Sequence, residues 1–343
     1  MQIFKKTVFF IAVNLIIVSL LTLMLAQPSV LKILLKEAKE ADYDTIIIGQ
    51  SHGETGYNPY ILSDTTGYNV FNISRRLTPN VNLYYILREI NKNEHYKRVI
   101  WDLDSSYWTV DHSGCYGTDS NLIFKLSGLE RISYIKNVVF NDNYNDTFAD
   151  FDFNLDNVKK AKVNIKCKLN KDYILRKPDS INRIYSTMGI SEYYKYQGRG
   201  FRYGVKKSNI TWSNYTFNKN KIKSENLQCF YEIIEYCKDK NIELICVISA
   251  LPPYRLKNEN YDDVHEYFNR LSSENNIAFY DLNYIKKEYF PRTDSDYVDL
   301  DGHMMGETAN RQSVILGKIL LSESKDDFFY DNYSEVVKNH CCL

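Results

Sequence analysis

The chain has 343 residues, with 43 basic and 43 acidic side chains, so its formal net charge is zero. This balance gives no support for nucleic-acid binding. The length suits one large domain, or one domain that carries an insertion. The seven cysteines have neither the spacing of a disulfide framework nor that of a zinc site. We therefore expect no disulfide scaffold, no metal and no cofactor.

Near the N-terminus, residues 7–26 form a stretch of 20 residues without a charge, interrupted only by Asn14, Ser19 and Thr22. As a helix this stretch would be about 30 Å long, which matches the hydrocarbon thickness of a bilayer. We predict a membrane anchor over residues 1–26, followed by a linker over residues 27–40. A cleaved signal peptide is the alternative. Lysines flank the stretch on both sides, so their count does not decide its orientation.

A strand-like run from Thr45 to Ile48 ends in the turn Gly49-Gln50-Ser51-His52-Gly53. A glycine turn after a buried strand can lift a serine hydroxyl clear of the sheet edge. Serine is a weak nucleophile and needs a base within hydrogen-bond reach. Ser51 is therefore the candidate nucleophile. Neighbouring side chains in an extended segment point opposite ways, so we interpret His52 as a structural or substrate contact and not as the base.

The base is expected from a second motif, Asp299-Leu300-Asp301-Gly302-His303, about 250 residues further on. Acyl-transfer sites on unrelated folds combine serine, histidine and a carboxylate, and geometry defines them better than chain order does. We predict His303 as the base. Asp301 is the preferred residue to orient its ring, and Asp299 is the alternative.

Apolar patterns along the chain alternate between strand and helix. A helix is predicted to start at Thr78-Pro79, with apolar residues at helical spacing up to Ile90. The remaining expected elements are strands at 98–103, 242–249 and 278–282, a helical stripe at 227–237 and a final helix at 307–321. The alternation favours a parallel sheet with helices on both faces. Such sheets carry their sites beyond the carboxyl ends of the strands, which would place Ser51 and His303 at one edge.

Residues 106–224 break this alternation and are rich in Asn, Tyr and Lys. We expect an insertion or cap there, with a helix from Asn121 to Val139 and a pliable segment from Gln197 to Gly200. This segment either recognises the acceptor or is a solvent-exposed insertion without a function at the site. Arg255, which follows a predicted strand, either contacts an anionic substrate or lies on the surface. Residues 323–343 are expected as a C-terminal tail.

Four short segments resemble the SGNH (GDSL-like) hydrolase superfamily. They are Ile46 to His52, Tyr57 to Pro59, Val70 to Ser74 and Tyr297 to Gly306. The resemblance covers residues 41–105 and 225–322. It is to the membrane-anchored branch that includes the D-alanyl-lipoteichoic acid transfer protein (DltD-like) and relatives of the alginate O-acetyltransferases. It implies a doubly wound, flavodoxin-like three-layer fold.

The resemblance also implies acyl transfer or ester hydrolysis by Ser51, with His303 as base. The superfamily's usual acid stands three residues before the histidine, where this chain has Leu300, so Asp301 and Asp299 both remain open. The superfamily builds its oxyanion hole with a glycine and an asparagine, and this chain has no clear Gly-x-Asn block. Asn72 is the best remaining side-chain donor, beside the backbone near Ser51; a turn residue that bonds its own backbone is the alternative. The Gly-x-Ser-x-Gly pattern also suits an α/β-hydrolase, but there the acid and the histidine usually lie on separate loops.

These expectations combine into one functional hypothesis. The protein would be a membrane-anchored, extracytoplasmic serine acyltransferase or esterase that adds or removes O-acetyl groups on a cell-envelope polysaccharide. D-Alanyl transfer to teichoic acid is the alternative, with a partner such as a membrane acyltransferase that supplies the acyl group. A non-catalytic, anchored binding protein of the same fold is the third possibility.

Overall fold

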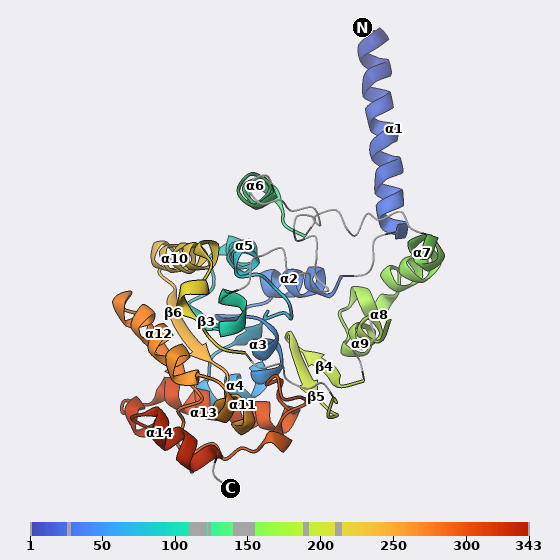
Figure 1. Ribbon diagram of the computed structural model, residues 1–343. Helices are drawn as coiled ribbons and strands as arrows, with labels where there is room; N and C mark the ends of the chain where they lie inside the picture. Colours follow the sequence, from blue (N-terminus) through green and yellow to red (C-terminus); the bar gives the residue numbers. More distant parts are fainter. Residues whose placement is uncertain are drawn as a thin grey trace.

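A five-stranded parallel sheet lies at the centre of the computed structural model, which describes residues 2–25, 29–109, 122, 125–139, 155–187, 192–209 and 215–341. The strand order is β2-β1-β3-β6-β7, as Figure 1 shows. The strands are β1 (Thr45–Ile48), β2 (Val70–Asn72), β3 (Arg98–Asp102), β6 (Glu243–Ile248) and β7 (Ala278–Asp281), and all neighbours pair in parallel. The prediction of an α/β protein with a parallel sheet is confirmed.

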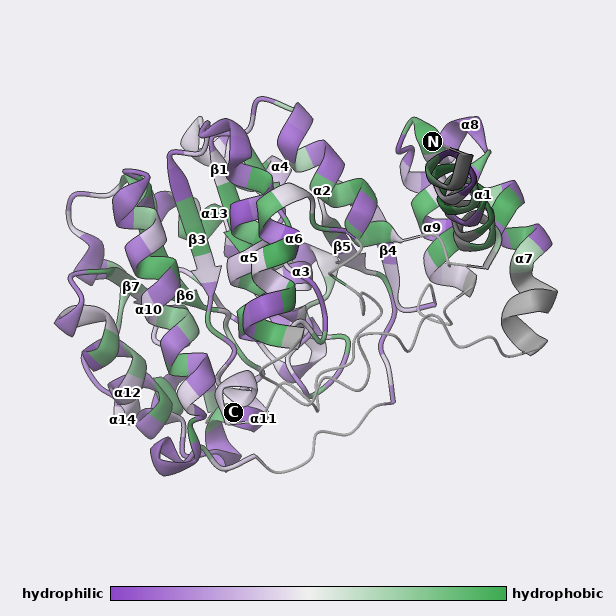
Figure 2. Cartoon of the chain, turned by 90° about the horizontal axis from the view of Figure 1, so that it is seen from above, coloured by the Kyte–Doolittle hydropathy of each residue, from purple (hydrophilic) through white to green (hydrophobic). Residues whose placement is uncertain are grey.

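Helices cover both faces of this sheet. Because side chains alternate along a strand, Ile46 and Ile48 enter one apolar core while Ile47 enters another. The first core is closed by α2 (Val30–Glu40), α5 (Asn80–Ile90), α10 (Ser224–Asp239) and α12 (Tyr261–Glu274), and the second by α4 (Pro59–Thr66) and α13 (Gly306–Leu321). Figure 2 shows hydrophobic and hydrophilic residues on the same helices, as expected of elements that bury one side.

The predicted strands match β1, β3, β6 and β7 within one residue at each end, whereas β2 and α4 were not predicted. The predicted helix after Pro79 is α5, and the final helix predicted from residue 307 is α13. The helical stripe at 227–237 lies in α10, where Cys229 and Cys237 are buried as apolar residues. Helix α12 was not predicted, although its inward residues, such as Val264, Phe268 and Leu271, have helical spacing.

Two segments that were expected outside the core pack against it. In the expected linker, residues 30–40 form α2, because Leu31, Leu34, Leu35 and Ala38 have the spacing of one helix face and are buried. The expected C-terminal tail contains a 3-10 turn (Lys325–Phe328) and the short helix α14 (Tyr333–Val336). Its His340 is buried and contacts the carbonyl of Ile285 at 2.8 Å.

The segment 106–224 contains helices and a separate antiparallel hairpin. The helices are α6 (Gly128–Tyr134), α7 (Leu155–Lys168), α8 (Lys171–Ile174) and α9 (Pro178–Thr187), and the hairpin joins β4 (Tyr194–Gly198) to β5 (Phe201–Gly204). The helix predicted from residue 121 begins only at Gly128. Ser127 is extended and donates its N–H to Glu89 at 3.0 Å, which starts the helix later; residues 121, 123 and 124 lie outside the described residues.

The tip of the hairpin docks on β2. The carbonyl of Arg199 accepts the N–H of Asn72 at 3.0 Å. Gly200 has a φ of +83°, and a Cβ there would lie 1.5 Å from the carbonyl oxygen of Asn72. Only glycine permits this approach. The segment expected to be pliable is therefore the point at which the hairpin is fixed to the sheet.

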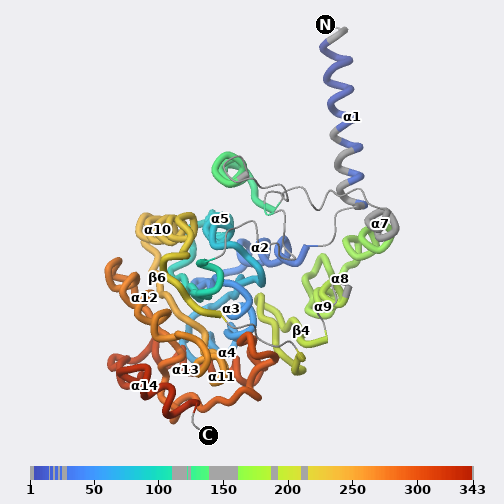
Figure 3. Tube along the Cα trace, in the orientation of Figure 1, coloured from blue at the N-terminus to red at the C-terminus, as the bar shows by residue number. Residues whose placement is uncertain are grey.

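The N-terminal prediction is corrected by the structure. Residues 2–25 form helix α1 (Gln2–Leu25), which projects from the body, with α7 beside its base (Figure 3). Within the part of the chain that the structure describes, however, no helix is both long and apolar enough to cross a membrane. The predicted single-pass anchor, and the membrane localisation that depended on it, are therefore wrong.

Candidate functional site

The candidate nucleophile lies in a tight turn beyond the end of β1. Ser51 is half-buried and is the first residue of the short helix α3 (Ser51–Gly56). The first backbone bond across this turn joins Glu54 N to Gln50 O at 3.0 Å. The N–H groups of Ser51, His52 and Gly53 therefore have no acceptor within the helix. Such groups can stabilise an oxyanion that forms next to the serine.

Gly53 lets this turn pack closely against the sheet. A Cβ at position 53 would lie 2.6 Å from Ser74 Oγ and 3.3 Å from Asp102 Cβ. We expect Gly53→Ala to lower the free energy of unfolding by about 1–3 kcal/mol through overpacking, measured by urea denaturation. Ser74→Gly should recover part of this loss in the double variant, because it removes the obstructing atoms. Equal stability of Gly53→Ala and wild type would contradict the close packing.

The candidate base is held by Asp299. His303 Nδ1 lies 2.8 Å from one carboxylate oxygen of Asp299 and 3.0 Å from the other. The same carboxylate accepts the backbone N–H groups of Gly302 and His303, each at 3.2 Å. The carboxylate of Asp301 is 4.0 Å from His303 Nδ1, and its side chain is 51% exposed. The geometry thus favours Asp299, the alternative, over the preferred Asp301 as the orienting acid.

Charge around His303 sets its protonation. Burial lowers the pKa of His303, but the hydrogen bond to Asp299 and the charges of Asp299, Asp301 and Asp104 outweigh burial and raise the pKa above 6.5. Burial likewise raises the pKa of Asp299, yet its hydrogen bond to His303 brings the pKa below the ordinary value. Asp299 therefore stays ionised and accepts the Nδ1 proton. Nε2 is the nitrogen left to take a proton from a nucleophile.

His52 joins the nucleophile turn to the loop that carries His303. Its Nδ1 lies 3.2 Å from Asp104 Oδ2, and its Nε2 lies 2.9 Å from the backbone oxygen of Asp301. Both ring nitrogens therefore face hydrogen-bond acceptors. The His52 and His303 rings lie 5.3 Å apart between centroids. Because His52 follows Ser51 directly, these contacts bring the Ser51 turn and His303 to the same edge of the sheet, in agreement with a structural interpretation of His52.

Asp104 completes this connection from the segment after β3. Burial raises the pKa of Asp104, but the charge of His52 and hydrogen bonds from Ser106 outweigh it, so the pKa lies below the ordinary value. Asp104 is therefore a carboxylate that holds His52 in place. Sequence reasoning missed this residue, because nothing in the spacing of Asp104 and His52 along the chain signals their contact.

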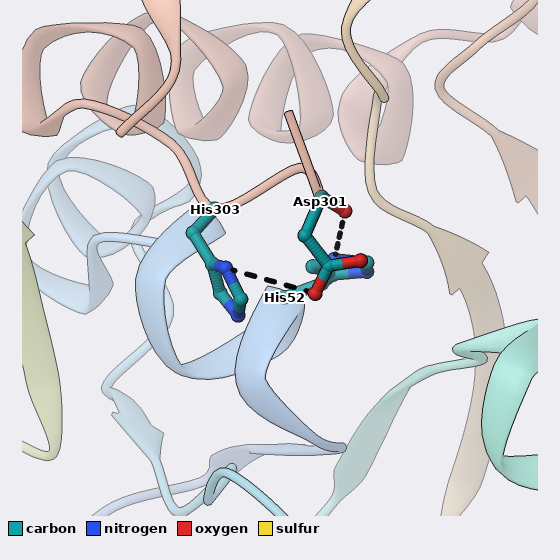
Figure 4. A group of neighbouring side chains, drawn as sticks. All are labelled: His52, Asp301 and His303. Carbon is teal, nitrogen blue, oxygen red and sulfur yellow. Dashed lines mark hydrogen bonds and ion pairs between the residues drawn. The ribbon is translucent and has the colours of Figure 1, made fainter. Parts of the chain in front are cut away.

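The same cluster could also bind a metal ion. His52, Asp301 and His303 each offer one ligand atom, and these atoms lie within 4.8 Å of one another (Figure 4). Histidine and carboxylate are common ligands, and ligating histidines usually carry a carboxylate on the other ring nitrogen, as both do here. However, the Nε2 of His52 faces the Asp301 carbonyl and would have to lose its proton and turn. The expectation of no metal was based on the spacing of the cysteines, which gives no information about His52, Asp301 and His303.

Two further predicted residues have other partners. The side-chain amide of Asn72 donates to the backbone oxygens of Gly53 at 2.8 Å and Tyr57 at 3.0 Å. Both amide hydrogens are used, so Asn72 holds α3 in place and has none to give an oxyanion. Arg255 is buried, not on the surface; it pairs with Glu259 at 2.8 Å and donates to the backbone oxygen of Asp301. Arg255 thus holds the loop that carries His303 through the backbone of Asp301.

Among known proteins, neither a family model nor a curated sequence matches this chain. The functional assignment therefore depends on the geometry of Ser51, His303 and their neighbours.

Proposed function

We propose that this protein is a serine-dependent esterase or acyltransferase of the SGNH type that removes or adds acyl groups on a polysaccharide. The observation that carries the proposal is that His303, held by Asp299 at 2.8 Å, lies against the residue that follows Ser51. The strand order β2-β1-β3-β6-β7 supports it, because this is the order of a doubly wound, flavodoxin-like sheet. Such sheets bind substrates beyond their carboxyl ends, where both segments lie.

In the first half-reaction, Ser51 Oγ attacks the acyl carbonyl carbon and His303 Nε2 takes its proton. Negative charge develops on the carbonyl oxygen, toward which the backbone N–H groups of residues 51–53 can donate. When the intermediate collapses, the ester C–O bond breaks, and the leaving alcohol receives the proton from Nε2. Ser51 then carries the acyl group.

In the second half-reaction, water or a sugar hydroxyl attacks the acyl-serine. His303 Nε2 takes the proton of the attacking hydroxyl, and when the acyl–serine bond breaks it passes this proton to Ser51 Oγ. Asp299 stays ionised throughout and stabilises the imidazolium form of His303. The hairpin β4–β5 lies where it can contact the acceptor, because the Tyr194 ring is 6.4 Å from the His303 ring. This contact supports a function in acceptor recognition for the segment 106–224.

Labelling by a fluorophosphonate tests the proposal, because the reagent reacts with an activated serine. We expect labelling of the wild-type protein, none of Ser51→Ala and little of His303→Ala. The matched control is His265→Ala, since His265 also pairs with an aspartate, Asp281, at 2.9 Å, but lies on α12. This variant should label like the wild type.

Two outcomes would redirect the assignment. A folded wild-type protein that does not label would favour the non-catalytic binding protein, with which the fully used amide of Asn72 is consistent. Activity that EDTA abolishes and Zn²⁺ restores would assign His52, Asp301 and His303 to a metal centre instead.

A further inference from the structure

A buried carboxyl group packs against the turn that carries Ser51. It belongs to Asp102, the last residue of β3, which is 1% exposed. A Cβ at Gly49 would lie 3.0 Å from Asp102 Cβ, and a Cβ at Gly53 would lie 3.3 Å from it. The two glycines stand on either side of Ser51 in the chain, so the Asp102 side chain is in direct contact with the nucleophile turn. A change in the charge of Asp102 therefore acts on that turn.

The two oxygens of this carboxyl group have different surroundings. Oδ1 accepts three hydrogen bonds, from the Ser249 N–H at 2.9 Å, the Ser249 hydroxyl at 3.0 Å and the Tyr57 hydroxyl at 3.2 Å. Within the described residues, the buried Oδ2 has no hydrogen-bond partner. A hydroxyl that donates to an ionised carboxylate usually lies at about 2.5–2.7 Å, so both hydroxyl distances suit a neutral acceptor. This asymmetry is that of an un-ionised acid, with Oδ1 as the carbonyl oxygen and Oδ2 as the hydroxyl.

The groups around Asp102 favour the same protonation state. The titratable groups that face it are Tyr57, through its hydrogen bond, and Asp104, two residues further along the chain. β6 faces it with the neutral Ser249, and β1 and α3 face it with glycines. Burial and the negative charge of Asp104 raise the pKa of Asp102 to about 7, although the hydrogen bonds from Ser249 and Tyr57 lower it. Tyr57 stays neutral, because burial raises the pKa of its hydroxyl well above the ordinary value.

We propose that Asp102 is a positioning residue that must be un-ionised for acyl transfer, so that loss of its proton to solvent inactivates the site at alkaline pH. A neutral acid leaves the backbone N–H groups of the Ser51 turn available to an oxyanion. A carboxylate in the same place would repel the developing negative charge and attract those N–H groups, which would distort the turn. The consequence for catalysis rests on the proposed function, whereas the protonation of Asp102 does not.

The pH dependence of ester hydrolysis by the full chain tests the proposal. Asp102→Asn is the decisive variant, because asparagine has the shape of the neutral acid and cannot ionise. We expect kcat/KM of the wild type to fall on the alkaline side by about tenfold per pH unit, the slope of a single ionisation. Asp102→Asn should reach a maximum within about threefold of the wild type and lack this alkaline limb. An unchanged alkaline limb in the folded variant would overturn the proposal.

Ser249→Ala keeps the test valid if Asp102→Asn does not fold. It removes a hydroxyl that donates to Oδ1, and this donor favours the ionised form, so the pKa of Asp102 and the alkaline limb should both move up. A limb that does not move would contradict the proposal. The matched control is Asp281→Asn, at the same end of β7, because both carboxylate oxygens of Asp281 have donors, among them Tyr261 and His265. This variant should keep the alkaline limb of the wild type.

Urea denaturation gives a readout that does not need catalysis. The raised pKa means that the acid is protonated in the folded chain but ionises near 3.8 in the unfolded chain, so its stabilising contribution is lost as the pH rises from about 4 to about 7. The urea midpoint of Asp102→Asn should therefore rise relative to the wild type over this range and keep a constant difference above it. A difference that does not change with pH would overturn the protonation of Asp102. The expected shift without fluorophosphonate labelling of Ser51 would keep the buried acid and remove the esterase.

Discussion

Alanine at Ser51 or at His303 is expected to lower p-nitrophenyl acetate hydrolysis by about 10³- to 10⁶-fold relative to the wild-type protein. Ser51 supplies the attacking oxygen, and His303 is the residue positioned to take its proton. Because the two act in one step, the double variant should be no slower than the slower single variant. Initial rates at saturating ester, on protein whose fold is checked by circular dichroism, provide the measurement.

The control for this prediction is a histidine–aspartate pair on helix α12, His265 and Asp281. His265 contacts Asp281 at 2.9 Å, as His303 contacts Asp299, but it packs against Tyr284 with ring centroids 3.8 Å apart. His265→Ala should therefore keep the wild-type rate, apart from any loss of folded protein. If all three single variants hydrolyse the ester at the wild-type rate, Ser51 and His303 do not catalyse the reaction.

Asparagine at Asp299 should lower kcat/KM by about 10²- to 10⁴-fold, because the amide no longer fixes the Nδ1–H form of His303. Asparagine at Asp301 should cost less than about tenfold, since its carboxylate is 4.0 Å from Nδ1 and half-exposed. The two variants make the same chemical change two residues apart, so each controls for the other. A larger loss at position 301 would return the orienting function to Asp301.

The pH profile gives the same test an independent readout. His303 acts as a base only when neutral, so kcat/KM rises with pH through its pKa. The net effect of its surroundings raises that pKa above 6.5, although burial alone lowers it, and the acid limb of the wild type should therefore lie above pH 6.5. Asp299→Asn removes the strongest group that raises the pKa. Its acid limb should move to lower pH, whereas an unmoved limb would show that His303 is not the titrating base.

Regular apolar patterns made the sheet predictable. Thr45 to Ile48 and Ile242 to Ser249 are nearly unbroken apolar runs, and they correspond to β1 and β6 because both faces of the central strands are buried. The glycine turn likewise marked the end of β1 and the position of Ser51 just after it. These features depend on local periodicity, which a single sequence records.

The choice between Asp299 and Asp301 depended on loop geometry that spacing does not record. Gly302 has a φ of +111°, and the turn lets the Asp299 carboxylate reach Nδ1 while the Asp301 side chain faces outward. The contact of His52 with Asp104 and the ion pair of Arg202 with Glu54 join distant parts of the chain. Pairings of this kind arise from tertiary packing and leave no pattern along the sequence.

The order of the elements along the chain also bears on synthesis. All five strands of the sheet lie between residues 45 and 281, but Asp299, His303 and α13 follow them. A nascent chain that has produced its whole sheet therefore still lacks the base, and the face that contains Ile47 and Val247 is covered by α4 but not yet by α13. Until α13 has left the ribosome, the uncovered part of that apolar face is open to aggregation, and chaperone binding at this stage would protect the chain.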